Sequence, residues 1–207
     1  QEKRRYVGGY VSDDNRYLFI SAANSTSGNE LYLKDLSVPN SPIVAIHKGF
    51  EYDVDVLDNI GTTLFIVTNL KAPNKRIVTV DVAHTGVENW KDVIPETEQV
   101  LNPSTGAGYI FANYMKDAVS VVKQFDYKGK LIRTIALPGV GTASGFGGKA
   151  KDKELYFSFT NYVTPGTTYT FFPDSGKSSV YVKPKVDFVS ENYESKQVYF
   201  TSKDGTK

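Results

Sequence analysis

Two carboxylates, Asp53 and Asp55, alternate within the run Tyr52–Val56, in which polar and apolar residues take turns. Alternate residues of a strand point to the same face, so both carboxylates are expected on one side of a strand. A close pair of carboxylates can carry out acid–base catalysis. A solvated strand face or the wall of a tunnel is the simpler interpretation of this pattern, and it is the one that we favour.

The other combinations of residues that could do chemistry are incomplete. Ser144 has no glycine two positions before it, so the nucleophile elbow G-x-S-x-G is missing. The glycine-rich run from Gly145 to Lys149 lacks the spacing of a phosphate-binding loop. The two histidines, His47 and His84, fall in different repeat units, and the chain has no cysteine, so no convergent set of metal ligands is expected. We therefore predict no catalytic residues, no metal and no cofactor, and a chain that is not an enzyme by itself.

The strongest pattern in the sequence is a repeat. Five times an aliphatic residue is followed at once by an aromatic one inside a strand-like run, at Leu18-Phe19, Leu64-Phe65, Ile110-Phe111, Leu155-Tyr156 and Val198-Tyr199. The first members of these pairs are 46, 46, 45 and 43 residues apart. An aspartate that closes the next strand-like run keeps nearly the same period, at Asp35, Asp81, Asp126 and Asp174. Self-similarity at roughly 40–50 residues, with several strands per unit, is typical of the blades of a β-propeller.

Each unit is expected to contain four short antiparallel strands joined by turns. The blades are predicted at residues 6–48, 52–95, 100–137 and 142–183, and final strands within 188–201 begin a further blade. The predicted fold class is therefore all-β: one domain over residues 1–207, a partial propeller of about four four-stranded blades. The repeated aspartates are interpreted as caps of turns at strand ends, because a catalytic group would not recur once per blade.

The place of a strand in its blade predicts what its side chains contact. The first strand of each blade should line the central channel, which puts the following residues near the axis: Tyr10, Asp53 or Asp55, Asn102 and Ser144. Aromatic residues of the second strands should pack between neighbouring blades: Phe19, Phe65, Phe111 and Tyr156.

Composition argues against several kinds of partner. The chain has 24 Lys and Arg and 23 Asp and Glu, interspersed, with a net charge of +1, so no nucleic-acid or membrane partner is predicted. No apolar stretch approaches the roughly 18–20 residues of a membrane span. The charged start, Gln1–Arg5, leads into no apolar segment, so no signal peptide is predicted there. We expect a soluble protein, with cytoplasm and periplasm both left open.

Three segments resemble one known family. The run Phe159–Tyr169, F-T-N-Y-V-T-P-G-T-T-Y, is similar to the last-blade segment of prolyl oligopeptidases, F-T-[S/N]-[F/Y]-x-[S/T]-P-x-x-x-Y. The tail Val198–Lys207 resembles the junction at which the propeller of that family returns to its α/β-hydrolase domain. Tyr6–Gly9 followed by Ser12–Tyr17 is similar to a blade start of the same family. The resemblance covers nearly the whole chain, in order.

This resemblance implies a serine peptidase that cuts short peptides after proline, with a seven-bladed propeller that covers the catalytic triad and restricts access. The chain would correspond to roughly the fourth to seventh blades, and its partner would be the α/β-hydrolase domain of the same parent chain. In the animal enzymes a Met before the Gly-Gly pair and an Arg in the following loop reach the substrate pocket. Aligned without gaps, these positions fall on Val7 and Asn24. Val7 keeps an apolar wall, whereas Asn24 cannot make the charge-assisted contact of an Arg, so either the substrate is held differently or the chain belongs to a divergent bacterial-type branch.

Two other functions are weighed against this one. A free-standing propeller that acts as a protein-interaction scaffold has no need of the tail Ser202–Thr206. A glycan-binding or glycosidase propeller is expected to have inward-facing tryptophans and a conspicuous pair of carboxylates. The only tryptophan of the sequence, Trp90, is expected in an outer connection.

An arc of about four blades leaves its first and last faces uncovered. The residues expected there are Val7, Tyr17 and Phe19 on the first face and Phe188, Tyr193 and Tyr199 on the last. Because large exposed apolar patches are rarely tolerated on a monomer, the arc should associate with a second copy or close on itself.

Overall fold

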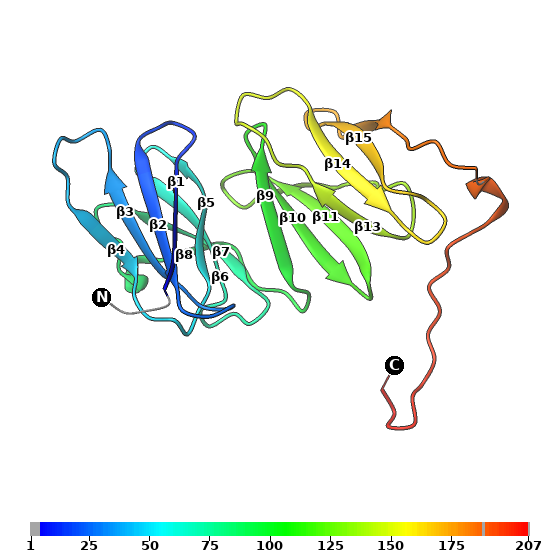
Figure 1. Ribbon diagram of the computed structural model, residues 1–207, viewed down its shortest axis with the longest axis horizontal. Helices are drawn as coiled ribbons and strands as arrows, with labels where there is room; N and C mark the ends of the chain where they lie inside the picture. Colours follow the sequence, from blue (N-terminus) through cyan, green and yellow to red (C-terminus); the bar gives the residue numbers. More distant parts are fainter. Residues whose placement is uncertain (1–4, 188, 207) are drawn as a thin grey trace.

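The chain folds into four β-sheets that follow one another along the sequence (Figure 1). The computed structural model describes residues 5–187 and 189–206. In every sheet the strands lie in chain order and are antiparallel, so each sheet is a four-stranded meander, which we call a blade. The structure confirms the predicted fold class, an all-β partial propeller.

The strands of the four blades have the following bounds. The first blade contains β1 (Tyr6–Val11), β2 (Tyr17–Ala23), β3 (Glu30–Asp35) and β4 (Ile43–His47). The second contains β5 (Val54–Ile60), β6 (Thr63–Thr68), β7 (Arg76–Asp81) and β8 (Lys91–Ile94). The third contains β9 (Leu101–Gly106), β10 (Tyr109–Lys116), β11 (Val119–Phe125) and β12 (Leu131–Thr134). The fourth contains β13 (Thr142–Gly145), β14 (Leu155–Thr160), β15 (Thr167–Phe172) and β16 (Lys177–Val182). Two 3-10 helices, η1 (Val87–Asn89) and η2 (Ser190–Asn192), complete the described elements.

Three apolar cores lie between consecutive blades. One joins the first and second blades and includes Phe19 and Val54. The next joins the second and third blades around Phe65 and Ile110, and the last joins the third and fourth. Burial of apolar side chains contributes roughly 1.5–3 kcal/mol for each large residue, so the packing of blade on blade is the main source of stability.

The middle blades bury both faces, and this explains the second-strand aromatics. In β6 and β10 both members of the aliphatic–aromatic pair are buried. The prediction that Phe19, Phe65 and Phe111 pack between blades is confirmed.

The same prediction is wrong for Tyr156. This side chain is 40% exposed and lies edge-on to Tyr181. In β14 the buried face is formed by Leu155, Phe157 and Phe159. Because strand residues alternate, Tyr156 points to the opposite face, which no further blade covers in the described part of the chain.

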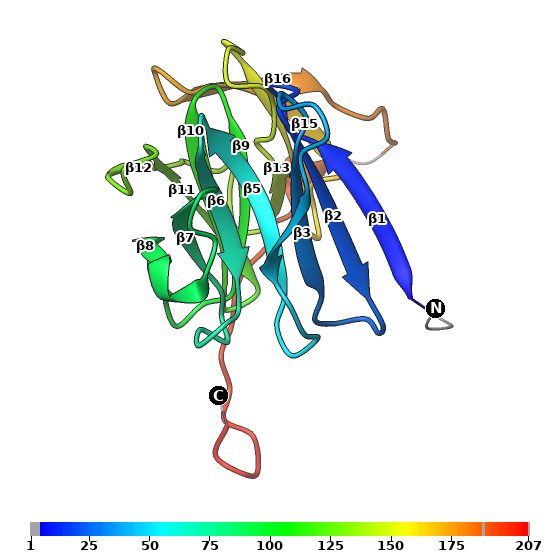
Figure 2. The same cartoon turned by 90° about the vertical axis from the view of Figure 1, so that its left-hand side faces the viewer.

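The prediction of the uncovered face of the first blade is also wrong for two of its three residues. Tyr17 and Phe19 are buried against the second blade, not exposed as predicted. The residues of β1 and β2 on the other face include Val7, Val11, Leu18 and Ile20. Val7 is 65% exposed, as predicted. In Figure 2, β1, β2 and β3 lie side by side at the right of the molecule, and β5 and β6 of the second blade lie to their left.

The final strands predicted within 188–201 do not form among the described residues. Phe188 lies outside the described residues, and the segment from Val189 to Thr201 contains only η2. Tyr193 and Tyr199 are exposed as predicted, but on this tail and not on a sheet face. An isolated extended segment has no ladder partner for its backbone groups, so its β-prone sequence is not sufficient to form a strand.

Candidate functional site

The blades have two ends, and the residues named by resemblance lie at one of them. We call the end at which the first strand of each blade begins the near rim, and the opposite end the far rim. Val7 lies on β1 opposite Ala22 of β2, and Asn24 follows β2 directly. Both side chains are exposed. The structure therefore places Val7 and Asn24 close together in the fold, at the near rim of the first blade.

A guanidinium group lies at the same rim, although not at position 24. Arg5 precedes β1, and its Nη1 donates to Oε2 of Glu30 at 3.2 Å. Tyr32 donates to the same carboxylate oxygen at 3.0 Å. The Arg5 guanidinium also lies 5.0 Å from the centre of the Phe50 ring, within the range of a cation–π contact. No pattern in the single sequence pointed to Arg5, because its pairing depends on the register of β1, β2 and β3.

The carboxylates Asp53 and Asp55 have different environments. Asp53 accepts a hydrogen bond from the backbone N–H of Gly28 at 2.8 Å and pairs with Nζ of Lys75 at 3.3 Å. The Gly28 N–H, followed by Lys75, lowers the pKa of Asp53. Desolvation of the carboxylate by the surrounding protein, followed by the charge of Asp53, raises the pKa of Asp55. Asp53 thus joins the loop before β3 in the first blade to the second blade, which favours a structural role for this carboxylate.

The pKa of Asp53 predicts how stability depends on pH. The folded value lies below that of the unfolded chain, about 3.9, so the ionised carboxylate stabilises the fold above that pH. This contribution is lost as the pH falls through the lower folded value. Asp53→Asn should reduce stability at pH 7 by at most about 1 kcal/mol, since the side chain is partly exposed. Its unfolding free energy should then fall less steeply with acid than that of the unchanged chain.

Urea unfolding at a series of pH values from neutral to acidic checks this expectation. Asp13→Asn, at an exposed position on the far rim, is the matched control. Parallel acid profiles for the Asp53 variant and the unchanged chain would contradict the assigned role.

The first strands of successive blades are joined to one another. The Tyr10 hydroxyl of β1 donates to the carbonyl of Val56 in β5 at 2.8 Å, and burial, followed by the charge of Asp55, raises the pKa of Tyr10 to about 12. Ser104 of β9 donates to the carbonyl of Gly145 in β13 at 2.9 Å. Side chains on these strands are accessible, Asn102 and Ser144 among them. The first strands β1, β5, β9 and β13 therefore present accessible polar side chains. On these strands no nucleophilic side chain lies beside a base.

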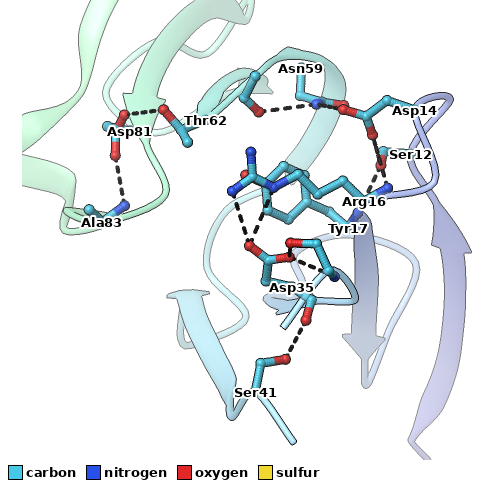
Figure 3. A network of polar contacts seen from close by, with 12 residues as sticks. Ser12, Asp14, Arg16, Tyr17, Asp35, Ser41, Asn59, Thr62, Asp81 and Ala83 are labelled. Atoms are coloured by element: carbon cyan, nitrogen blue, oxygen red, sulfur yellow. Dashed lines mark hydrogen bonds and ion pairs between the residues drawn. The ribbon is translucent and has the colours of Figure 1, made fainter. Parts of the chain in front are cut away.

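The far rim carries a network of carboxylates that cap turns (Figure 3). Asp14 accepts from Ser12, from the backbone of Arg16 and from Asn59 of the second blade. Although partial burial acts against it, these hydrogen bonds lower the pKa of Asp14. Asp35 pairs with Arg16 at 3.2 Å.

The repeated aspartates behave as predicted from the sequence in three of the four blades. Asp35, Asp81 and Asp126 each accept a hydrogen bond from the backbone N–H two residues later, at 2.8 to 2.9 Å. This is the geometry of an Asx turn. The interpretation of these three residues as turn caps is confirmed. Asp174 differs: its carboxylate accepts instead from Tyr109, at 3.4 Å.

The glycine-rich run holds an aromatic side chain and not a phosphate site. Gly145 has a φ of 117°, and a Cβ at this position would lie 2.6 Å from the carbonyl oxygen of Tyr156. This turn directs Phe146 into the core, where its ring stacks on Phe157 at 4.6 Å. Phe146 also stacks on Phe111 of the third blade, so this loop helps to pack the third blade on the fourth.

Histidines and acidic residues do not converge on a metal site. Burial lowers the pKa of His47, and His84 lies in a turn of the second blade. Among the described residues, no group of three or more His, Asp or Glu side chains could hold a metal ion. Within the same residues, no helix has the length and apolar character to cross a membrane.

Comparison with known proteins agrees with this geometry. A model of the prolyl oligopeptidase N-terminal β-propeller domain matches residues 1–184. The chain is 55% identical over 204 residues to a prolyl endopeptidase of Elizabethkingia miricola and 54% identical to one of Elizabethkingia meningoseptica. Each match covers 99% of this chain but only 29% of the relative.

A solved structure from a study of two prolyl endopeptidases and their inter-domain dynamics has the same fold. It superposes with a TM-score of 0.88 at 32% identity, over 98% of this chain and 30% of the other. The chain thus spans less than a third of the length of the proteins that it matches.

Proposed function

Because the chain belongs to the prolyl oligopeptidase family, of which it forms part of the N-terminal β-propeller domain, we propose that it restricts the access of short proline-containing peptides to a serine-peptidase domain of the same polypeptide. That domain, an α/β-hydrolase, is absent from residues 1–207. The observation that carries the proposal is the 55% identity to a prolyl endopeptidase over nearly the whole chain.

In this proposal the near rim faces the peptidase domain. Val7 would supply an apolar wall for a bound peptide, and Asn24 would offer a neutral amide. Arg5 would bring the guanidinium that position 24 lacks, held in place by Glu30. The division of the chain into blades at 6–48, 52–95, 100–137 and 142–183 is part of the same proposal.

A chimera tests the proposal without assuming the parent sequence. Residues 1–207 replace the matching segment of the Elizabethkingia miricola prolyl endopeptidase. The folded chimera should hydrolyse a proline-containing chromogenic peptide, and the isolated chain should not, because no nucleophile–base pair is found among the residues that the structure describes. Turnover by the isolated chain after removal of contaminating peptidases would contradict the proposal, as would a folded chimera with no activity.

Residues 1–207, expressed as an isolated polypeptide, are expected to associate with a second copy. The first blade exposes Val7, Val11 and Ile43, and the fourth exposes Tyr156 and Tyr181. Uncovered apolar faces of this kind favour association. Light scattering combined with binding of a hydrophobic dye checks this expectation, and a monodisperse monomer without dye binding would contradict it.

A further inference from the structure

A buried ring nitrogen of His47 has no hydrogen-bond partner at the end of the first blade. His47 is the last residue of β4, at the near rim, and its side chain is half-buried. Its Nε2 is closed to solvent and makes no hydrogen bond with any residue that the structure describes. The ring lies edge-on to Tyr52, with the two ring centres 6.4 Å apart. A protonated imidazole has two N–H donors that need acceptors, so this site suits the neutral ring.

Residues 48–52, which we call the linker loop, follow β4 and lead from the first blade to the second. The loop packs closely on the segment before β3. The backbone N–H of Asn29 donates to the carbonyl of Tyr52 at 3.0 Å. The carbonyl oxygen of Phe50 approaches Gly28 so closely that a Cβ on this glycine would lie 1.8 Å from it. The position of the linker loop therefore sets the arrangement of this part of the near rim.

Two carboxylates face the His47 ring. Glu51 lies in the linker loop, where its side chain covers Gly49, and Glu30 is the first residue of β3. Burial lowers the pKa of His47, and the charges of Glu51 and Glu30 offset this effect only in part. Glu30 is also paired with Arg5, from the segment before β1, at 3.2 Å. A protonated His47 would thus be disfavoured in its present place and attracted by the carboxylates beside it.

We propose that His47 is a pH-sensitive latch: its neutral ring holds the linker loop closed, and on protonation the ring leaves its site and the loop opens. Opening separates Tyr52 from the backbone of Asn29 and withdraws the Phe50 ring from Arg5, which now lies 5.0 Å from the ring centre. The near rim changes as a result, and in the proposed function this rim faces the peptidase domain. The latch itself requires no peptidase domain, so it can be tested on the present chain.

The direction of the pH dependence follows from the two positions of the ring. In the open loop the ring is solvated and has the ordinary pKa of about 6.5, whereas in the closed loop its pKa is lower. The closed loop is therefore fully favoured above about pH 6.5, and this advantage is lost as the pH falls through the lower value. Asp53 has a lowered pKa and stays ionised near pH 6. Desolvation raises the pKa of Asp55, so this carboxylate is the rival cause of a transition.

The test follows the amide of Asn29, whose hydrogen bond to the linker loop breaks on opening. Its protection against hydrogen exchange, relative to the intrinsic rate at each pH, should fall at least about threefold between about pH 7.5 and pH 5. His47→Phe keeps an aromatic ring but cannot be protonated, so its protection should stay at the neutral-pH level. Glu51→Gln removes a charge that favours the protonated ring, and it should move the fall to lower pH.

Two variants are the matched controls. His84→Gln changes the other histidine, which is exposed in a turn of the second blade, and Asp55→Asn removes the rival carboxylate. Both should keep the fall in protection. If His47→Phe does not fold, His47→Gln takes its place with the same expectation.

Three outcomes would overturn the latch. They are constant protection in the unchanged chain, a fall that persists without His47, and a fall that disappears in Asp55→Asn. None of these measurements depends on whether the chimera described above is active, so the latch and the proposed function can fail separately.

Discussion

Phe157→Ala is expected to lower the free energy of unfolding by about 3–5 kcal/mol, the usual cost of removing a large aromatic side chain from a core. The Phe157 ring is buried on the inner face of β14. It stacks on Phe146 at 4.6 Å and on Tyr169 at 5.0 Å. The change would leave a cavity between the third and fourth blades. Urea unfolding followed by circular dichroism measures the loss.

The neighbouring residue provides the matched control. Tyr156 is on the same strand, but its ring is on the opposite, uncovered face beside Tyr181. Tyr156→Ala should therefore cost about 1 kcal/mol or less. Equal losses from the two variants would mean that the blades do not pack through the inner face of β14.

Asn29→Ala is expected to cost about 2–4 kcal/mol, because it leaves two backbone groups without partners. The Asn29 side chain donates to the carbonyl of Val54 and accepts from the N–H of Val54, each at 2.9 Å. Both residues are buried. This pair of hydrogen bonds joins the loop before β3 to the start of β5, and so fixes the second blade on the first.

Asn24→Ala is the control for this prediction. Asn24 lies in the same loop and is exposed, so its replacement should change the unfolding free energy by no more than about 0.5 kcal/mol. The difference between the two variants in urea unfolding isolates the contribution of the buried amide. If Asn29→Ala were as stable as Asn24→Ala, the loop would not join the blades.

The repeat made the order of the strands predictable. A period of 43–46 residues in the aliphatic–aromatic pairs places a second strand in each blade, and Asp35, Asp81 and Asp126 mark the ends of third strands. Turn-forming residues locate the remaining boundaries to within a few positions. One shift occurs in β5, which begins at Val54 and continues to Ile60 through a bulge beyond Val56.

The faces of the strands were harder to predict than their positions. An aliphatic–aromatic pair contains one residue for each face of a strand, and which of them is buried depends on the neighbouring blades. Both are buried in the middle blades, whereas the first blade buries Phe19 more fully than Leu18, and the fourth buries Leu155 and exposes Tyr156. The strand predicted in the tail does not form for a related reason, because Val198 and Tyr199 have no strand to pair with in the described part of the chain.

The candidate site was predictable only where a local pattern existed. The alternation of Asp53 and Asp55 was visible, but their partners Gly28 and Lys75 come from other loops. The contact between Arg5 and Glu30 also joins residues 25 positions apart. Such contacts are set by the register of the strands within a blade and by the packing of one blade on the next, and one sequence carries no signal for them.

The proposed role of this propeller is to admit short peptides to a peptidase domain of the same polypeptide. The measurement that tests it most directly is kcat/KM of the chimera for a short proline-containing peptide and for an unfolded proline-containing protein, with the relative itself as reference. We expect both enzymes to favour the short peptide by at least about 100-fold, a difference of roughly 2.7 kcal/mol in transition-state free energy. A folded, active chimera that cleaves the two substrates equally well, while the relative discriminates between them, would contradict the claim.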